Sequence, residues 1–289
     1  MFKKIKYMVL CVSGRAGSDF FHALLDNHEE ISQLPGCIYF DEIYEKVKNK
    51  PDANHIINII FKDYSFLFNS KLSGSECHDK LGKNKLQSYK VNIKKFKKIF
   101  CKNFKEISYF SFENLINLIH YSYYVANNKK ITKIKYILLN LHHYQRIKKL
   151  PYFDFRLVYM YRHPVALINS AVKSKIFTYQ GSLFTPRSLL WYLNRAIFEI
   201  RTLKNFNYNP IIIKLEDLHK DNKFLLNKFC KTLGIKYKKS MLEPTFHGKK
   251  WWGDKFSGNQ LTGIDKNFKN KINPLSLIHI SEPTRRYSI

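Results

Sequence analysis

The first thirty residues alternate between apolar and small polar positions in a way that predicts a strand, a turn and a helix. Tyr7–Val12 (YMVLCV) is a continuous apolar run, as found in buried parallel strands. The following SGRAGS contains two glycines and predicts a tight turn, and DFFHALLDNH then places apolar side chains at helical spacing. When a glycine-containing turn joins a strand to a helix, several backbone N–H groups lie at the helix N-terminus and can bind an anion there.

The same alternation returns in the second half of the chain. Tyr136–Leu141 and Phe155–Arg162 predict two further strands, and Pro164 is well suited to begin a helix. The segment Asn209–Leu218 contains another buried strand, and Asp221–Ile235 is an amphipathic helix with an aspartate cap and a glycine near its end. Strands that alternate with helices predict an α/β fold of three layers around a mainly parallel central sheet.

The middle and the end of the chain carry weaker signals. Residues from about 40 to 130 are rich in Lys, Phe, Tyr and Asn, which predicts helices packed around the sheet, and Leu72–Lys85 predicts an exposed loop. Near the end, Leu275–Arg285 (LSLIHISEPTR) resembles the translation of a sequencing-library adapter. We therefore expect one domain over residues 1–274 and a non-native tail over residues 275–289.

Composition excludes some classes of protein. The 289 residues are 45% hydrophobic, enough to bury a large core, so a wholly disordered basic chain is excluded. The formal net charge is +28, which favours a polyanionic partner such as nucleic acid, an anionic membrane surface or a phosphorylated ligand. However, Lys and Asn are also enriched by AT-rich codon usage, so the charge alone does not select one of these partners.

Cysteine usage and hydropathy suggest a compartment. The five cysteines are widely spaced and form no C-x-x-C pair, so neither a disulfide framework nor a cysteine-based zinc site is indicated. The apolar run Tyr7–Val12 is far shorter than the ~20 residues of a membrane span, and no cleavage site follows it. These features predict a soluble, cytoplasmic protein.

The predicted turn after the first strand is the first candidate anion site. Its glycines allow close backbone approach to a ligand, and the arginine between them adds a planar fork suited to phosphate oxygens. It lacks the G-K-[ST] ending of a Walker A loop, which disfavours an ordinary P-loop kinase. A tight structural turn is the alternative. The residues of this turn are Ser13, Gly14, Arg15, Ala16, Gly17 and Ser18.

A second candidate lies at the end of the strand Phe155–Arg162. Arg162 ends this strand at the carboxyl edge, where open α/β sheets bind ligands. Ser170 follows eight residues later, about two helical turns on, and can turn back toward Arg162. An arginine and a hydroxyl suit a second phosphate, although an arginine paired with a carboxylate and a solvated serine would give the same pattern.

Together and in this order, these segments resemble the PAPS-dependent sulfotransferases of bacterial and Golgi type. Ser13–Gly36 is similar to their 5′-phosphosulfate loop and helix, and Val158–Val172 to their 3′-phosphate motif. Ile211–Leu218 is similar to a strand that usually ends in Y-E-D-L, and Gly248–Gly258 (GKKWWGDKFSG) to a late loop that covers the nucleotide. The middle third of the chain has no counterpart in this resemblance.

The resemblance implies a function and a set of residues. The chain would transfer the sulfuryl group of PAPS, without a metal, to a hydroxyl or amine, most plausibly on a carbohydrate or glycolipid. Arg15, Gly17 and Ser18 would cradle the 5′-phosphosulfate, Arg15 would stabilise the departing phosphate, and Arg162 with Ser170 would hold the 3′-phosphate. In the late loop, the expected nucleotide contacts are Lys249, Lys250, Trp252 and Gly253.

Two points of the resemblance stay open. Asp19 stands where many members have a second Ser or Thr, and its charge would repel phosphates unless it points away from them. The general base is not singled out. The candidates are His142 and His143 after the strand Tyr136–Leu141, and Asp41 or Glu42 after the first helix; each set also has an ordinary structural explanation.

Two other functions fit parts of the sequence. One is nucleic-acid or membrane-surface binding through Lys94–Lys105 (KKFKKIFCKNFK), although a solvated lysine face above buried Phe and Ile explains this segment more simply. The other is a degenerate sulfotransferase fold that binds nucleotide without turnover. The enzyme hypothesis requires the residues of both phosphate motifs to converge in one cleft.

Overall fold

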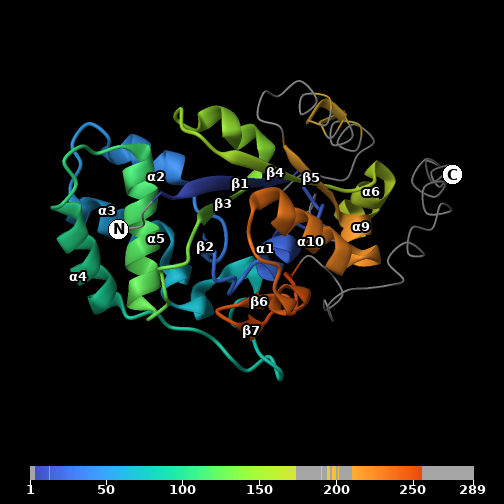
Figure 1. Cartoon of the computed structure of the whole chain (residues 1–289), viewed down its shortest axis with the longest axis horizontal. Helices are drawn as coiled ribbons and strands as arrows, with labels where there is room; N and C mark the ends of the chain where they lie inside the picture. The colour runs from blue at the N-terminus through green and yellow to red at the C-terminus, as the bar shows by residue number, and fades with distance from the viewer. Residues whose placement is uncertain are drawn as a thin grey trace, which may run out of the picture.

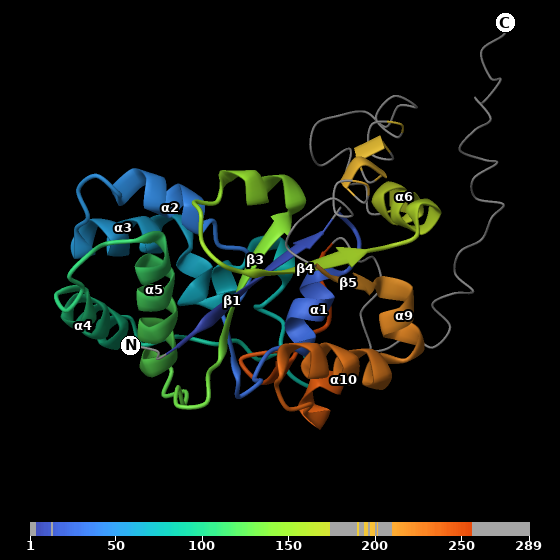
Figure 2. The same cartoon turned by 45° about the horizontal axis from the view of Figure 1, so that its top comes forward.

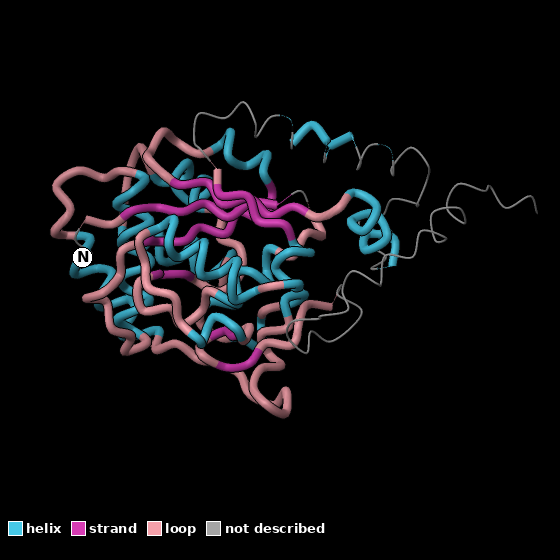
Figure 3. Tube along the Cα trace, turned by 45° about the vertical axis from the view of Figure 1, so that its right-hand side comes forward, coloured by secondary structure: helices cyan, strands magenta, loops and turns pink. Residues whose placement is uncertain are grey.

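The computed structural model describes residues 4–12, 14–173, 190, 194–195, 197–199, 201 and 210–255. Five strands form one parallel sheet in the order β2-β3-β1-β4-β5 (Figure 1). Their bounds are β1 Lys6–Val12, β2 Ile31–Gln33, β3 Tyr136–His143, β4 Arg156–Tyr161 and β5 Ile211–Lys214. The strands form a single twisted layer with helical segments on both sides, as Figure 3 shows. The expected α/β fold around a parallel sheet is confirmed.

Burial explains why the apolar runs form the centre of this sheet. In β1 every residue after Lys6 is buried, and β3 is buried along its first six residues. Parallel strands covered on both faces need such runs. The three-residue strand β2 was not predicted, because ISQ is too short and too polar to show a pattern. The expectation of a buried strand near Asn209 is only partly right: β5 lies at one end of the described sheet, and Ile212 is 53% exposed.

Helices cover the sheet as Figures 1 and 2 show, with α2 to α5 gathered at one end and α1, α9 and α10 near the other. Two of the helices begin with an aspartate cap. The Asp52 carboxylate accepts the backbone N–H of His55, and the Asp221 carboxylate accepts that of Phe224. Gly234 ends α10 in the left-handed conformation, as predicted. The bounds are α1 Ser18–Leu24, α2 Phe40–Val47, α3 Ala53–Asp63, α4 Ile93–Phe104, α5 Phe112–Ala126, α6 Pro164–Lys173, α9 Leu215–Lys220 and α10 Asn222–Leu233.

Helix α4 contains the lysine-rich segment that had suggested a nucleic-acid or membrane surface. Phe96 and Phe100 are fully buried on its inner side, and most of its lysines are exposed. Lys97 lies over the ring of Phe61, with its ammonium 5.0 Å from the ring centroid. The helix is therefore amphipathic because it packs on the protein itself, which is the simpler of the two explanations.

The segment Leu72–Lys85 is not the exposed loop that its composition predicts. Its chain forms short turns and a 3₁₀ helix at Gly74–Glu76, and both His78 and Leu81 are buried. The C-terminal part of the chain covers it: the ring centroids of His78 and Phe246 are 4.1 Å apart, and Trp251 Nε1 donates to the carbonyl of Glu76 at 2.9 Å. Such contacts between distant segments leave no trace in local composition.

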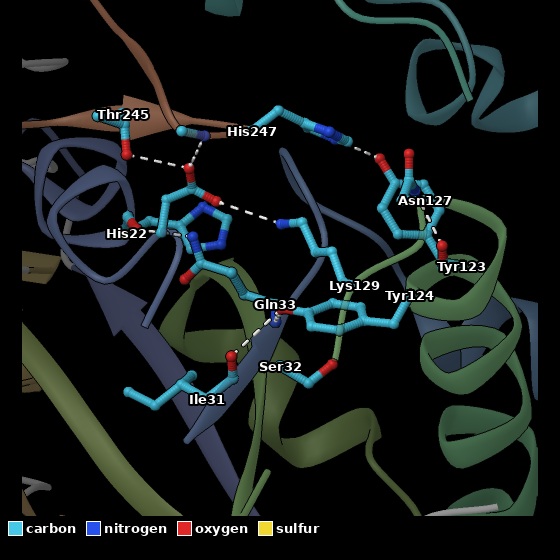
Figure 4. A network of polar contacts seen from close by, with 12 residues as sticks. His22, Ile31, Ser32, Gln33, Tyr123, Tyr124, Asn127, Lys129, Thr245 and His247 are labelled. Atoms are coloured by element: carbon cyan, nitrogen blue, oxygen red, sulfur yellow. Dashed lines mark hydrogen bonds and ion pairs between the residues drawn. The ribbon is translucent and has the colours of Figure 1, made fainter. Parts of the chain in front are cut away.

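A short antiparallel hairpin, β6 (Thr245–Phe246) and β7 (Lys249–Lys250), begins this C-terminal cover. Buried Asp26 holds it, since its carboxylate accepts from Thr245 Oγ1 at 3.0 Å and from the backbone N–H of Gly248 at 2.8 Å. Figure 4 shows the surrounding polar contacts, including His247 Nε2 at 2.7 Å from the hydroxyl of Tyr123. The hairpin is thereby fixed beside α1 and α5, and the residues after it extend toward the loop after β1.

Candidate functional site

The carboxyl ends of β1, β3 and β4 meet at one edge of the sheet. Because the three strands are parallel neighbours, the loop after β1, the histidines that end β3 and Arg162 after β4 lie together at this edge. Open α/β sheets bind ligands at such an edge. The topology thus brings two of the predicted phosphate motifs together.

The loop after β1 has an unusual backbone. Gly14 has φ 87° and Gly17 has φ 81°, and Arg15 between them also has a positive φ of 35°. A Cβ on Gly17 would lie 2.6 Å from Cδ1 of Leu215, so this glycine is required by both its conformation and its close packing on α9. Gly17 also caps α1 without a side-chain hydrogen bond. Ser13, predicted to start the loop, lies outside the described residues.

Arg15 joins the two motifs. Its Nε donates to Ser170 Oγ at 3.5 Å, and its carbonyl accepts from Nη1 of Arg162 at 3.4 Å. These partners are 155 and 147 residues away in the sequence. Arg15, Arg162 and Ser170, which come from both phosphate motifs, are therefore in contact, and Ser18 follows Gly17 at the start of α1.

Arg162 is held in a desolvated position. The pKa of Arg162 is lowered to about 10, mainly because burial disfavours the charged form; the carboxylate of Glu216 opposes this shift, and the positive charge of Arg15 adds to it. Glu216 is itself buried at the start of α9, and its Oε1 accepts the backbone N–H of His163 at 3.0 Å. Glu216 thus ties the end of β4 to α9.

His142 is placed at the edge by a β-bulge. In the pairing with β1, Leu10 faces Asn140 but Cys11 faces His142, and His142 has φ 59°. Its Nδ1 lies 3.2 Å from Ser18 Oγ and 3.8 Å from Asp19 Oδ1. Burial would lower the pKa of His142, but the hydrogen bond and charge of Asp19 outweigh it and raise the pKa above its ordinary value. Asp19 is accordingly turned toward the imidazole.

The other three candidate bases have different surroundings. His143 Nδ1 lies 3.5 Å from Nη2 of Arg195, and burial together with His142 and that arginine lowers the pKa of His143 to about 4. Glu42 is paired with Nη2 of Arg146 at 2.6 Å, and buried Asp41 contacts the same nitrogen at 3.2 Å. Asp41 and Glu42 thus form ion pairs with Arg146, which follows β3 directly. Of the candidate bases, His142 is the one in contact with the phosphate loop.

The late loop reaches the site through Asp254, which the sequence did not indicate as a site residue. Lys249 Nζ donates to the carbonyl of Ser88, and Lys250 Nζ lies 4.1 Å from the ring centroid of Trp252. Trp252 Nε1 donates to the carbonyl of Gly82 at 2.6 Å. These contacts secure the loop against residues 82–88. After Gly253, whose φ is 99°, Asp254 Oδ2 lies 3.6 Å from Nη1 of Arg15.

Two further groups near the loop carry negative charge or sulfur. Burial, followed by the charges of Asp19 and Asp254, raises the pKa of Glu76 to about 8. Burial and the charges of Asp19 and Glu76 also raise the pKa of the Cys37 thiol well above its ordinary value. Neither residue was predicted to lie at the site, because Glu76 is in a segment expected to be exposed and Cys37 follows the unpredicted strand β2. The Pro-Gly pair before Cys37 was the one local sign of a strand end there.

Comparison with known proteins identifies the fold as that of sulfotransferase domains, an α/β fold of P-loop type. The sulfotransferase domain from the Curacin biosynthetic pathway is 13% identical, with a TM-score of 0.53 over 99% of this chain and 94% of that one. The sulfotransferase domain from the Synechococcus PCC 7002 olefin synthase is also 13% identical, with a TM-score of 0.47 over 100% and 94%. No protein-family model and no curated protein matches the chain.

Two general expectations concern the whole described chain. All five cysteines are free thiols, in keeping with the absence of a predicted disulfide framework. Among the residues that the structure describes, no helix has both the length and the apolar character needed to cross a bilayer. The tail predicted at residues 275–289 and the end of the late loop, residues 256–258, lie outside the described residues.

Proposed function

We propose that this protein is a sulfotransferase that uses PAPS as the sulfuryl donor. The observation that supports it is the contact of Arg15 with both Ser170 and Arg162, at 3.5 and 3.4 Å. Two segments that resemble separate phosphate-binding motifs are thereby joined at the ligand-binding edge of the sheet.

The donor site would use positive charge and small residues. Arg162 and Ser170 would bind the 3′-phosphate, which suits a desolvated guanidinium next to a hydroxyl. The positive-φ backbone of the loop Gly14–Ser18, with Ala16 buried beneath it, would lie against the 5′-phosphosulfate, where Arg15 stabilises negative charge. Asp19 is compatible with this arrangement because its carboxylate faces His142 rather than the arginines.

The chemistry would follow the logic of in-line phosphoryl transfer. PAPS, when bound, supplies an activated sulfuryl group whose bond to the phosphate oxygen breaks as the acceptor oxygen attacks sulfur. His142 would take the proton of the acceptor hydroxyl, and Arg15 would hold the charge left on the phosphate. Arg15 would first have to exchange its contact with Asp254 for the donor.

The acceptor proposal is broader. We infer a hydroxyl, or alternatively an amine, on a carbohydrate or glycolipid, because the resemblance is to enzymes that act on such acceptors. The five free thiols suit a reaction in the reducing cytoplasm, and the exposed lysines would attract acidic acceptors without specific nucleic-acid binding. Peripheral contact with an anionic membrane would bring a glycolipid acceptor close.

Calorimetric titration with PAP and with 5′-AMP tests the donor site. The wild type should bind PAP more tightly than 5′-AMP, because only PAP carries the 3′-phosphate. Arg162→Ala should weaken PAP binding roughly 30-fold or more and remove most of the preference over 5′-AMP. Ser170→Ala should reduce the same preference, whereas Arg15→Ala should weaken both ligands.

Arg156→Ala is the matched control, because Arg156 begins β4 at the opposite end of the strand from Arg162. This variant should bind PAP like the wild type. No binding of PAP by the wild type, or an unchanged preference in Arg162→Ala, would refute the proposed donor site. Tight PAP binding without transfer of labelled sulfate to any carbohydrate or glycolipid offered would instead identify a nucleotide-binding protein that does not turn over.

A further inference from the structure

Three side chains with metal-binding atoms meet beside the phosphate loop. Asp19 lies in the first turn of α1, Cys37 follows β2, and His142 lies at the end of β3. One ligand atom from each residue lies within 4.8 Å of the other two, and Asp19 Oδ1 is 3.8 Å from His142 Nδ1. His142 lies more than 100 residues after Asp19 and Cys37 in the sequence, so the fold brings its imidazole to the other two side chains.

The chemistry of the set selects a class of ion. A carboxylate oxygen, a thiolate sulfur and an imidazole nitrogen are the three ligand types of Zn²⁺, whereas Mg²⁺ and Ca²⁺ prefer oxygen alone. The side chains of Asp19 and His142 are 22% and 29% exposed, and Cys37 is also partly exposed. An ion therefore has a route from solvent, and a fourth position can be taken by water.

Asn140 adds an independent observation. It is only 4% exposed, and its Oδ1 accepts the backbone N–H of His142 at 3.3 Å. Its Nδ2 lies near the Asp19 carboxylate but has no hydrogen-bond partner at an ordinary distance in the described part of the chain. A buried amide facing the carboxylate is the kind of outer partner that orients a metal ligand.

We propose that Asp19, Cys37 and His142 bind a single divalent cation of the zinc type. Coordination uses the lone pair of one imidazole nitrogen and leaves the proton on the other, so His142 cannot accept a proton while the ion is bound. If His142 is the base of the proposed transfer, the ion inhibits that reaction. This consequence rests on the proposed function, whereas binding of the ion does not.

The test uses the full chain, freed of metal by dialysis against a chelator and titrated with Co²⁺ as a spectroscopic substitute for Zn²⁺. We expect one equivalent to bind and to give the charge-transfer absorption of a cobalt–thiolate bond. Cys37→Ser should lose this absorption. Cys101→Ser is the matched control, because Cys101 is also partly exposed but lies on α4, and it should keep the absorption.

Asp19→Asn keeps the size of the side chain, and circular dichroism verifies its fold. Asp19→Asn should weaken Co²⁺ binding by about 10- to 100-fold or more, because removing groups that merely support a metal ligand already has an effect of that size. An absent charge-transfer band in the wild type, or a band that persists in Cys37→Ser, would overturn the proposal. PAP titration of the metal-free chain distinguishes the two proposals, since loss of the metal site leaves donor binding in place.

Discussion

Replacing Gly17 by alanine tests how the phosphate loop is held on the sheet. The backbone at Gly17 has φ 81°, which costs an L-residue about 1–2 kcal/mol. The added Cβ would lie 2.6 Å from Cδ1 of Leu215, and displacing that buried side chain costs about 1–3 kcal/mol. Alanine also restricts the unfolded chain more than glycine does, which stabilises the folded state by about 0.4–1 kcal/mol. We expect Gly17→Ala to lower the free energy of unfolding by about 3 kcal/mol.

Gly74→Ala is the matched control. Gly74 has φ 60°, but a Cβ there would meet nothing within 4 Å. This variant carries the conformational cost without the contact, so it should lose about 1 kcal/mol. Urea unfolding of both variants under one set of conditions gives the comparison. The difference of about 2 kcal/mol measures the packing of Gly17 against Leu215.

A double mutant provides the decisive result. In a Leu215→Ala background the clashing methyl group is gone, so the cost of Gly17→Ala should fall to that of Gly74→Ala. Equal costs for Gly17→Ala and Gly74→Ala in the wild-type background would refute the reasoning. A cost that stays near 3 kcal/mol without the Leu215 side chain would also refute it.

Three further predictions concern the stability of the fold. Burial lowers the pKa of His22 to about 4 and the pKa values of His78 and His120 to about 3, from an ordinary value of 6.5. The stability that each contributes is therefore fully present above pH 6.5, and below it falls by up to about 1.4 kcal/mol per pH unit for each histidine. The raised pKa values of Glu76, Glu199 and His142 have the opposite effect, but the pKa values of His28, His143 and His247 are lowered as well. Unfolding midpoints in urea should therefore fall between pH 6.5 and 5, and a flat profile would contradict the buried, neutral state of these histidines. Asp221→Ala removes the cap of α10 and should lower the free energy of unfolding by about 1 kcal/mol, which an unchanged urea midpoint would exclude. Asp26→Asn should cost roughly 1–3 kcal/mol and speed amide exchange at residues 245–250; protection equal to the wild type would show that Asp26 does not anchor the hairpin.

Local sequence was sufficient to predict several helices and strands and the two phosphate-type motifs that follow β1 and β4. The apolar runs of β1, β3 and β4 and the cap residues of α10 produce their structures through short-range preferences, so they could be predicted to within a residue or two. The order of Arg15, Arg162 and Ser170 along the chain also implied a shared edge, because parallel strands bring their carboxyl ends together. Their actual contact needed coordinates.

Local sequence was not sufficient where a segment is shaped by partners far along the chain. The region Leu72–Lys85 looks polar and flexible, but Trp251 and Phe246 bury its centre from more than 160 residues away. For the same reason, no local pattern predicted the contact of Asp254 with Arg15 or that of Lys249 with the carbonyl of Ser88.

The sequence by itself determined an α/β chain with two phosphate-type motifs, since apolar periodicity and glycine conformations act over a few residues. Only the tertiary structure decided which groups share the site. A β-bulge places His142 against Ser18 and Asp19, Glu42 is paired with Arg146, and Cys37 and Glu76 lie near Asp19. Side-chain packing and charge act through space, and these distances are set when the whole chain folds.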